Sequence, residues 1–194
     1  MGLRMCSMAA FLTLAFACAH PSGTPEQAGV QTPTAPQVTP TAKAADVASP
    51  DAILAATYDV ISGPAGQPRD WERFRSLFLP GARLIPTGRN EKGSGFVAHT
   101  YTPEEYIARA TPFFQKEGFF EKESSRRTER YGNLVQAFST YESRHRPEDQ
   151  PFARGINSFQ LFFDGTRWWV VTIFWQAETP DTPIPNEFLP TVNK

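Results

Sequence analysis

The sequence predicts an α+β domain in which three helices precede four long antiparallel strands. Apolar residues recur with helical spacing within residues 49–118, whereas alternating, strand-like runs fill residues 119–176. Runs of helices followed by runs of strands are typical of α+β folds. The last two strands flank Asp164-Gly165, a dipeptide typical of tight hairpin turns, and are apolar on both faces. This part of the sheet therefore needs cover on both sides.

Strict alternation around a tight turn assigns the hairpin residues to two faces. One face is expected to carry Ile156, Ser158, Gln160, Phe162, Trp169, Val171, Ile173 and Trp175. The other is expected to carry Asn157, Phe159, Leu161, Phe163, Trp168, Val170, Thr172 and Phe174.

The first two helices have recognisable ends. The first is expected from Ser49, an N-cap followed by Pro50 at the first helical position, to Ile61. The second follows Asp70, another N-cap, and closes before Pro80. Both carry apolar residues along one stripe, so each should bury one face.

The third helix begins with the capping-box sequence Thr102 to Glu105 and stops at Gly118. Pro112 should kink or break it, because proline lacks the backbone donor that the helix needs. Strand-like runs complete the domain, and they cover residues 82–87, 95–101, 119–130, 134–145, 152–163 and 168–176.

Length and charge limit the classes of function. The chain has 194 residues and a formal net charge of −1, which favours a single domain without a nucleic-acid-binding surface. With 40% hydrophobic residues and 16 Phe, it can build a substantial core. Three arginines within residues 126–130 interleave with Glu121, Glu123 and Glu129, a pattern typical of a solvated strand face.

The N-terminus predicts export. Residues 1–17 combine Arg4, a short apolar stretch and the small-x-small pattern Ala15-Phe16-Ala17, as signal peptides do. The apolar stretch is shorter than the roughly 20 residues that span a bilayer. The sequence before Cys18 resembles a bacterial lipoprotein signal, in which this cysteine is acylated. We therefore expect a lipid-anchored protein of the cell envelope, and the alternative is a soluble periplasmic or secreted protein.

Three further boundaries follow from composition. Residues 18–48 are rich in Pro, Thr and Ala and contain no aromatic residue, so they predict a disordered tether. The folded domain is expected over residues 49–178. Residues 179–194 contain several prolines and predict an irregular tail.

Two motifs resemble the nuclear transport factor 2-like superfamily, also called SnoaL-like or ketosteroid-isomerase-like. The run DWERFRSLFLPGARL, residues 70–84, is similar to its helix ending in Leu-Phe, turn and first strand. The run DGTRWW, residues 164–169, is similar to its turn before the last long strand. The resemblance covers residues 49–178, and residues 141–144 and 154–158 look like an uncharacterised exported subgroup.

The resemblance implies a fold and an assembly. It implies a cone-shaped, bent antiparallel sheet wrapped around three N-terminal helices, with a pocket inside the cone. Many proteins of this fold dimerise through the outer sheet face, so a homodimer is expected here. The fold hosts enzymes and non-catalytic binders alike and does not name a reaction.

The resemblance to ketosteroid isomerases is incomplete at the residues that act. Tyr58 matches the tyrosine that donates to the oxyanion in those enzymes. The position of their base falls at about Pro86, which cannot accept a proton, and strands 134–145 and 152–163 carry no Asp for the second acid.

A second candidate set lies on the strands. Glu142 and Arg144 share a strand face, and Asn157 comes from the neighbouring strand. A carboxylate beside an arginine can orient water or a ligand, so Glu142 is a candidate base, while Arg144 and Asn157 are candidate ligand-placing groups. An ion pair on the outer face is the alternative. A one-residue shift would present Tyr141, Ser143 and His145 instead.

Three functional classes stay open. The first is a binder of a small apolar or mixed-polarity molecule in an accessory role, and the others are a hydrolase, dehydratase or isomerase-type enzyme and a dimerising interaction module. The two histidines of the domain lack the spacing of a metal site, and neither a metal nor a cofactor is predicted. The remaining candidate ligand-binding residues are Trp71, Trp169, Trp175, Tyr141 and His99.

Overall fold

The computed structural model describes residues 39–90 and 93–191. The chain divides into two units, Met1–Ala35 and Pro36–Lys194, and the fold is that of the second. The predicted signal peptide, Cys18 and most of the predicted tether lie outside the described residues.

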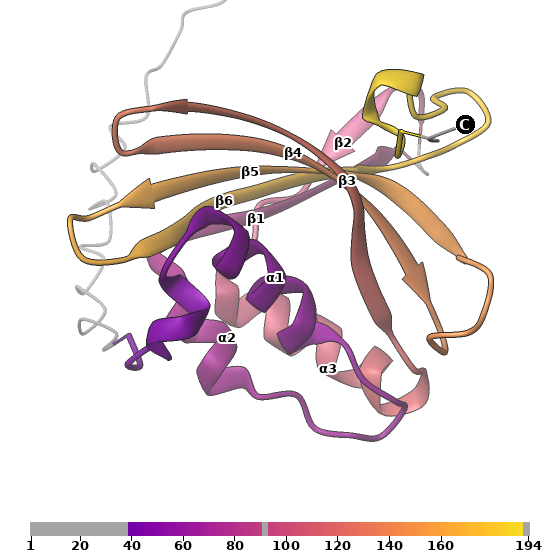
Figure 1. Ribbon diagram of the computed structural model, residues 1–194. Helices are drawn as coiled ribbons and strands as arrows, with labels where there is room; N and C mark the ends of the chain where they lie inside the picture. The colour runs from indigo at the N-terminus through magenta and orange to yellow at the C-terminus, as the bar shows by residue number, and fades with distance from the viewer. Residues whose placement is uncertain (1–38, 91–92, 192–194) are drawn as a thin grey trace, which may run out of the picture. The chain divides into compact units, whose positions relative to one another are not determined.

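The element order follows the predicted one (Figure 1). The helices are α1 (Pro50–Ile61), α2 (Trp71–Leu77) and α3 (Pro103–Lys116), with two 3-10 turns, η1 (Ala44–Val47) and η2 (Asn186–Phe188). The strands are β1 (Phe78–Arg89), β2 (Phe96–Ala98), β3 (Phe120–Tyr131), β4 (Leu134–Arg144), β5 (Ala153–Phe163) and β6 (Trp168–Ala177).

The predicted helix starts are confirmed by their capping bonds. The Ser49 side chain accepts from the Ala52 amide at 3.0 Å, and Asp70 accepts from the Arg73 amide at 2.9 Å. Thr102 forms the predicted capping box at the start of α3. Pro112 does not end α3, which continues to Lys116. Pro112 is exposed, so the carbonyl that it leaves without a helical donor lies where water can reach.

The sheet has six strands in the order β2-β1-β6-β5-β4-β3. It is mixed, because β1 pairs with β6 in parallel while every other pairing is antiparallel. The expected all-antiparallel sheet is wrong at this pair. A parallel pair needs a long crossover, and here α3 together with β2 to β5 lies between the two strands.

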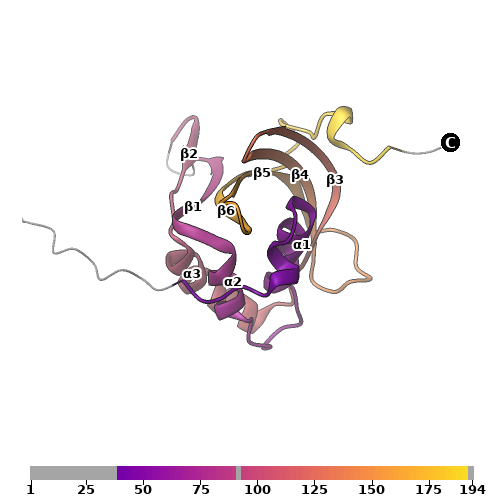
Figure 2. The same cartoon turned by 60° about the vertical axis from the view of Figure 1, so that its left-hand side comes forward.

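The sheet bends over the helices, and α1 lies inside the bend (Figures 1 and 2). The face toward the helices is called the inner face, and the opposite one the outer face. The largest side chains buried between the helices and the inner face are Phe74, Phe159, Ile53, Leu54, Leu77, Leu161, Val135 and Val170. Their burial supplies the main driving force for folding.

A β-bulge in β6 changes the faces of the hairpin. Leu161 pairs with Val170, but Gln160 pairs with Thr172, so Val171 is an extra residue without a partner in β5. Beyond Val171 the alternation is reversed. Ile173 and Trp175 therefore lie on the inner face with Phe159 and Asn157, where strict alternation had placed Thr172 and Phe174.

The C-terminal tail, predicted to be irregular, covers part of the outer face of the sheet. The Thr140 hydroxyl donates to the Phe188 carbonyl at 2.6 Å, and the Phe138 and Phe188 rings lie 5.6 Å apart. Ile184 is 8% exposed. The tail therefore shields part of the surface expected to dimerise, and a homodimer through the rest of that face stays a prediction.

The folded unit begins before Ser49. Val47 in η1 is buried, and Asp46 forms an ion pair with Arg73 of α2 at 2.7 Å. The predicted tether is thus wrong for its last residues, because an apolar side chain and a carboxylate there find partners on the domain. None of the described helices combines the length and the hydropathy that crossing a bilayer requires.

Candidate functional site

A cavity of about 250 Å³ lies between the helices and the inner face of the sheet. Most of its wall is aromatic or aliphatic, which is typical of small-molecule sites. The polar groups that reach it are Thr57, Tyr58, Tyr106, Glu121, Tyr141, Ser143 and Asn157. The apolar part of the wall includes Ile61, Phe74, Leu84, Phe119, Phe152, Phe159, Ile173 and Trp175.

Glu121, near the start of β3, is the acidic group of this cavity. Its backbone amide donates to the Ser62 hydroxyl at 3.0 Å, which ties β3 to the end of α1. The Ser143 hydroxyl donates to its carboxyl group at 2.7 Å. Burial raises the pKa of Glu121 to about 7, although hydrogen bonds from Ser143 and Asn157 oppose the shift.

Tyr58 carries the central hydroxyl of the site. It reaches from α1 to the sheet, where its hydroxyl lies 2.6 Å from the Ser139 hydroxyl oxygen. The Asn157 amide nitrogen donates to the Tyr58 oxygen at 3.1 Å. Burial raises the pKa of Tyr58, as does the nearby charge of Glu121, so this phenol stays protonated.

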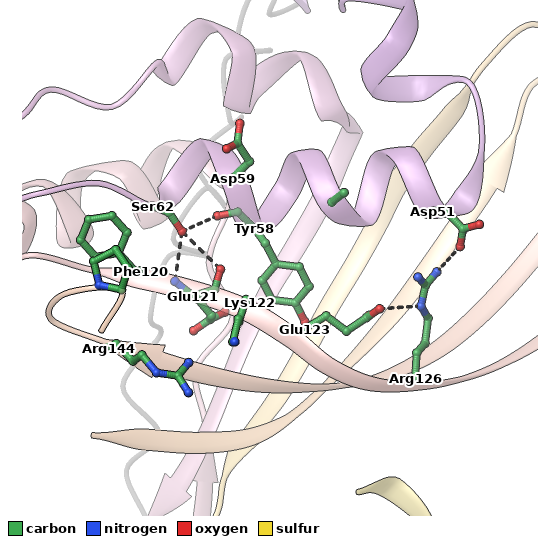
Figure 3. A pocket seen from close by; sticks show the side chains of 12 residues that line it. Asp51, Tyr58, Asp59, Ser62, Phe120, Glu121, Lys122, Glu123, Arg126 and Arg144 are labelled. Atoms are coloured by element: carbon green, nitrogen blue, oxygen red, sulfur yellow. Dashed lines mark hydrogen bonds and ion pairs between the residues drawn. The ribbon is translucent and has the colours of Figure 1, made fainter. Parts of the chain in front are cut away.

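A chain of polar contacts leads from Tyr58 to the surface. The Ser139 hydroxyl donates to Glu123, which also accepts from Arg126 at 2.9 Å. Arg126 bonds Asp51 of α1 at 2.6 Å. Tyr58, Glu123, Arg126 and Asp51 line a groove of about 520 Å³ between α1 and the edge strand β3, where Figure 3 shows Tyr58 directed toward Glu123. Tyr58 and Glu121 border both the groove and the cavity.

Two further tyrosines surround Glu121. Burial raises the pKa of Tyr106 and of Tyr141, and the charge of Glu121 adds to both shifts. Tyr141 fits because Gly155 on β5 has no side chain. A Cβ atom at position 155 would lie 2.5 Å from the Tyr141 hydroxyl oxygen.

A larger hollow adjoins the cavity. It measures about 790 Å³, lies between β1, β2 and α3, and shares Tyr106, Phe119 and Trp175 with the cavity wall. His99 and Arg109 line it, and Arg109 lies 4.8 Å from the Tyr101 ring centre. The hollow and the cavity therefore meet at these three aromatic side chains.

The structure brings together some of the predicted site residues. Tyr58, Tyr141, Asn157 and Trp175 line the cavity. His99 lies in the adjoining hollow.

Two of the predicted tryptophans do not line the cavity. Trp71 stacks on Phe114 with ring centres 6.1 Å apart. Trp169 lies on the outer side of the hairpin and donates to Asp164 at 2.6 Å.

The predicted pair Glu142 and Arg144 does not reach the cavity. The two side chains bond each other at 2.6 Å, Glu142 is paired with Arg154 across the strands, and Arg144 lines the groove beside α1 (Figure 3). The inward residues of β4 are Ser139, Tyr141 and Ser143, because the register is the alternative one. Asn157, expected beside Glu142, faces the opposite side of the sheet.

Glu121 and Ser139 were missed by sequence reasoning, and Ser143 was named only in the alternative register. Glu121 stood in a strand of alternating charges that indicated a solvated face. The signal that was present is the set of small polar residues on the otherwise apolar inward positions of β4 and β5. Within the described ranges, no cluster of three His, Cys, Asp or Glu side chains could hold a metal ion.

Comparisons with known proteins bear on the fold. No protein-family model and no curated protein matches the chain. A protein of unknown function with a cystatin-like fold from Nostoc punctiforme is 10% identical, with a TM-score of 0.50 over 66% of this chain and 87% of that chain.

Two other solved structures are similar. An NTF-2-like protein of unknown function from Silicibacter pomeroyi is 14% identical, with a TM-score of 0.46 over 68% of this chain and 94% of that chain. An uncharacterised protein with a cystatin-like fold from Caulobacter vibrioides is 13% identical, with a TM-score of 0.48 over 68% and 88% of the two chains.

The fold agrees with the nuclear transport factor 2-like cone expected from the sequence. The element order, the curved mixed sheet and the enclosed helices agree with that assignment. Identities this low show the fold alone, and the nuclear transport factor 2-like fold does not fix a ligand or a reaction.

The raised pKa of Glu121 predicts that stability falls as pH rises. The folded state keeps the proton up to about pH 7, whereas an ordinary glutamate loses it near 4.5. Stability supplied by the protonated form is complete below pH 4.5 and is lost as the pH rises to 7, on the order of 3 kcal/mol. Glu121→Gln should remove this loss, and urea unfolding between pH 4 and 8 measures it.

Glu142→Gln is the matched control, because Glu142 lies on the outer face of the adjacent strand. It should keep the pH profile of the natural protein. Parallel profiles for the natural protein and Glu121→Gln would contradict the assignment.

Proposed function

We propose that the domain binds a small molecule with an apolar body and one polar group in its interior cavity, in an accessory role. The observation that supports this most is the Glu121 carboxyl, held in a cavity whose wall is otherwise mainly apolar. Keeping an ionisable group in such surroundings costs free energy. A role in binding a ligand would explain why the domain keeps the carboxyl group there despite this cost.

The surrounding architecture supports the same reading. Trp175 and Phe159 offer flat apolar surface, while Tyr58 and Asn157 are fixed by hydrogen bonds before any ligand arrives. Groups that are already oriented lose little freedom on binding. We expect a ligand to enter from the adjoining hollow, on the side of α3.

Filling the cavity should abolish binding. Ala153 lines the cavity, whereas Gln160 on the same strand faces outward and is exposed. Ala153→Trp should weaken binding of a bicyclic probe, 2-tetralol, by about a hundredfold or more, since the added ring occupies its place. Gln160→Trp should leave affinity unchanged. Calorimetric titration measures both, and circular dichroism confirms folding.

Equal affinities for the natural protein and a folded Ala153→Trp variant would place binding elsewhere. Lack of binding by a panel of bicyclic probes would count against the proposal as a whole.

Acid–base catalysis is a second candidate, favoured by one observation. Glu121 has a pKa of about 7, which suits a group that takes and returns protons near neutral pH. As base it would remove an α-hydrogen of a carbonyl compound such as 2-tetralone, which NMR follows as exchange for deuterium. Glu121→Gln should slow this exchange by about 10²-fold or more. Exchange no faster than in buffer would exclude this chemistry for that probe.

We further propose that the protein is exported and anchored by a lipid on Cys18. The proposal rests on the sequence of residues 1–18, which precedes the described part of the chain. Cells expressing the natural chain should incorporate labelled palmitate into the protein and retain it in the membrane fraction. Cys18→Ser should lose both, and unlabelled protein from both chains would overturn the anchor.

A further inference from the structure

The ion pair between Glu123 and Arg126 sets the direction of the hydrogen bonds around Tyr58. Glu123 accepts from Arg126, and the two form an ion pair at 2.9 Å. A carboxylate can only accept hydrogen bonds. The Ser139 hydroxyl, which contacts the same carboxylate, must therefore be the donor.

This arrangement commits the hydrogen of Tyr58. Ser139 has one hydroxyl hydrogen and gives it to Glu123, so it can only accept at its 2.6 Å contact with Tyr58. Tyr58 therefore donates to Ser139. Its oxygen faces the cavity side as an acceptor, and there it already receives a hydrogen from Asn157.

The other donors at this end of the cavity are committed as well. Ser143 gives its hydrogen to Glu121. Asn157 has two amide hydrogens, of which one goes to Tyr58 and the other stabilises the charged carboxyl of Glu121. Once Glu121 has lost its proton, what remains for a ligand at this end is its carboxylate and the Tyr58 oxygen, both acceptors. The hydroxyls of Tyr106 and Tyr141 can donate or accept, so they do not discriminate between a donor and an acceptor on the ligand.

The charges around Glu121 also favour a ligand that donates hydrogen bonds. Among residues 39–90 and 93–191, no Lys, Arg or His forms an ion pair with Glu121, although Glu123 has Arg126. An ionised carboxylate with only neutral partners in a cavity is stabilised by a cation that enters beside it.

We propose that the polar group of the bound molecule is a hydrogen-bond donor, an amine or ammonium carried on an apolar skeleton, and not a carbonyl. This rests on the proposed binding function and specifies its ligand class. It also opposes the role of Tyr58 as a donor to an oxyanion, because the single hydrogen of that phenol is held by Ser139. The second, catalytic candidate would need another donor for a developing enolate.

Three probes with one skeleton test the proposal, namely 2-aminotetralin, 2-tetralol and 2-tetralone. Calorimetric titration at pH 8 keeps Glu121 ionised, since its pKa is about 7. The amine should bind at least about tenfold more tightly than the ketone, which corresponds to about 1.4 kcal/mol. Glu121→Gln should remove this preference.

Two variants separate acceptor from donor at position 58. Tyr58→Phe should weaken the amine and should not weaken the ketone, because no donor is lost from the cavity and the Asn157 hydrogen that Tyr58 accepted is released. Ser139→Ala releases the Tyr58 hydrogen, so the ketone should gain about tenfold. Ser158→Ala, on the outer face of β5, is the matched control and should bind as the natural protein does.

The possible outcomes are distinct. If the natural protein binds the ketone more tightly than the amine, or if Tyr58→Phe weakens binding of the ketone, the ligand is not a hydrogen-bond donor as proposed. The cavity would still be a binding site. Failure of all three probes to bind the natural protein would overturn the cavity proposal itself. If Ser139→Ala does not fold, Tyr58→Phe alone still decides between donor and acceptor.

Discussion

The site depends on one buried hydroxyl, that of Tyr58, which ties α1 to two strands of the sheet. It contacts Ser139 of β4 at 2.6 Å and Asn157 of β5 at 3.1 Å. Without these contacts the Tyr58 hydroxyl would be a buried polar group without a partner, at a cost of about 1–3 kcal/mol. The helix is therefore fixed relative to the inner face at a separation set by hydrogen bonds, and space remains beside it.

Two of the glutamates of β3 show how strongly position along an edge strand decides chemistry. Glu121 and Glu123 lie two residues apart and point to the same side. Glu123 borders the groove beside α1 and has Arg126 as its partner. Glu121 lies deeper and has only the neutral donors Ser143 and Asn157, so burial raises its pKa. One carboxylate thus has a cationic partner, and the other, Glu121, can change its charge near neutral pH.

Local chemistry explains what could be predicted from the sequence. The helix starts at Ser49, Asp70 and Thr102 depend on side chains within three residues, and the structure has all three. The positions of the strands along the sequence were also predicted from local patterns. The inward face of β4 could not be predicted in this way, because alternation allows two registers and only packing against the helices chooses between them.

Bulges account for the errors in sheet faces. The extra residue at Val171 reverses the inward set of β6, and a register shift in β3 lies between Glu123 and Ser125. Neither position carries glycine, the usual signal of a bulge. Glu121 was hidden for a related reason, since alternating charges on an edge strand indicate solvent. The face of that strand under α1 is covered only because the helix packs there.

The polarity of the cavity is controlled from outside it. The ion pair between Glu123 and Arg126 is partly exposed, and such pairs add little to stability. The ion pair instead affects binding through the direction of the hydrogen bonds, because each hydroxyl has only one hydrogen to donate. Once Ser139 donates its hydrogen to Glu123, Tyr58 must donate to Ser139, and the Tyr58 oxygen faces the cavity as an acceptor. A weak surface contact can therefore decide which ligands the interior accepts, since it changes the direction of every bond in the chain and not their strength.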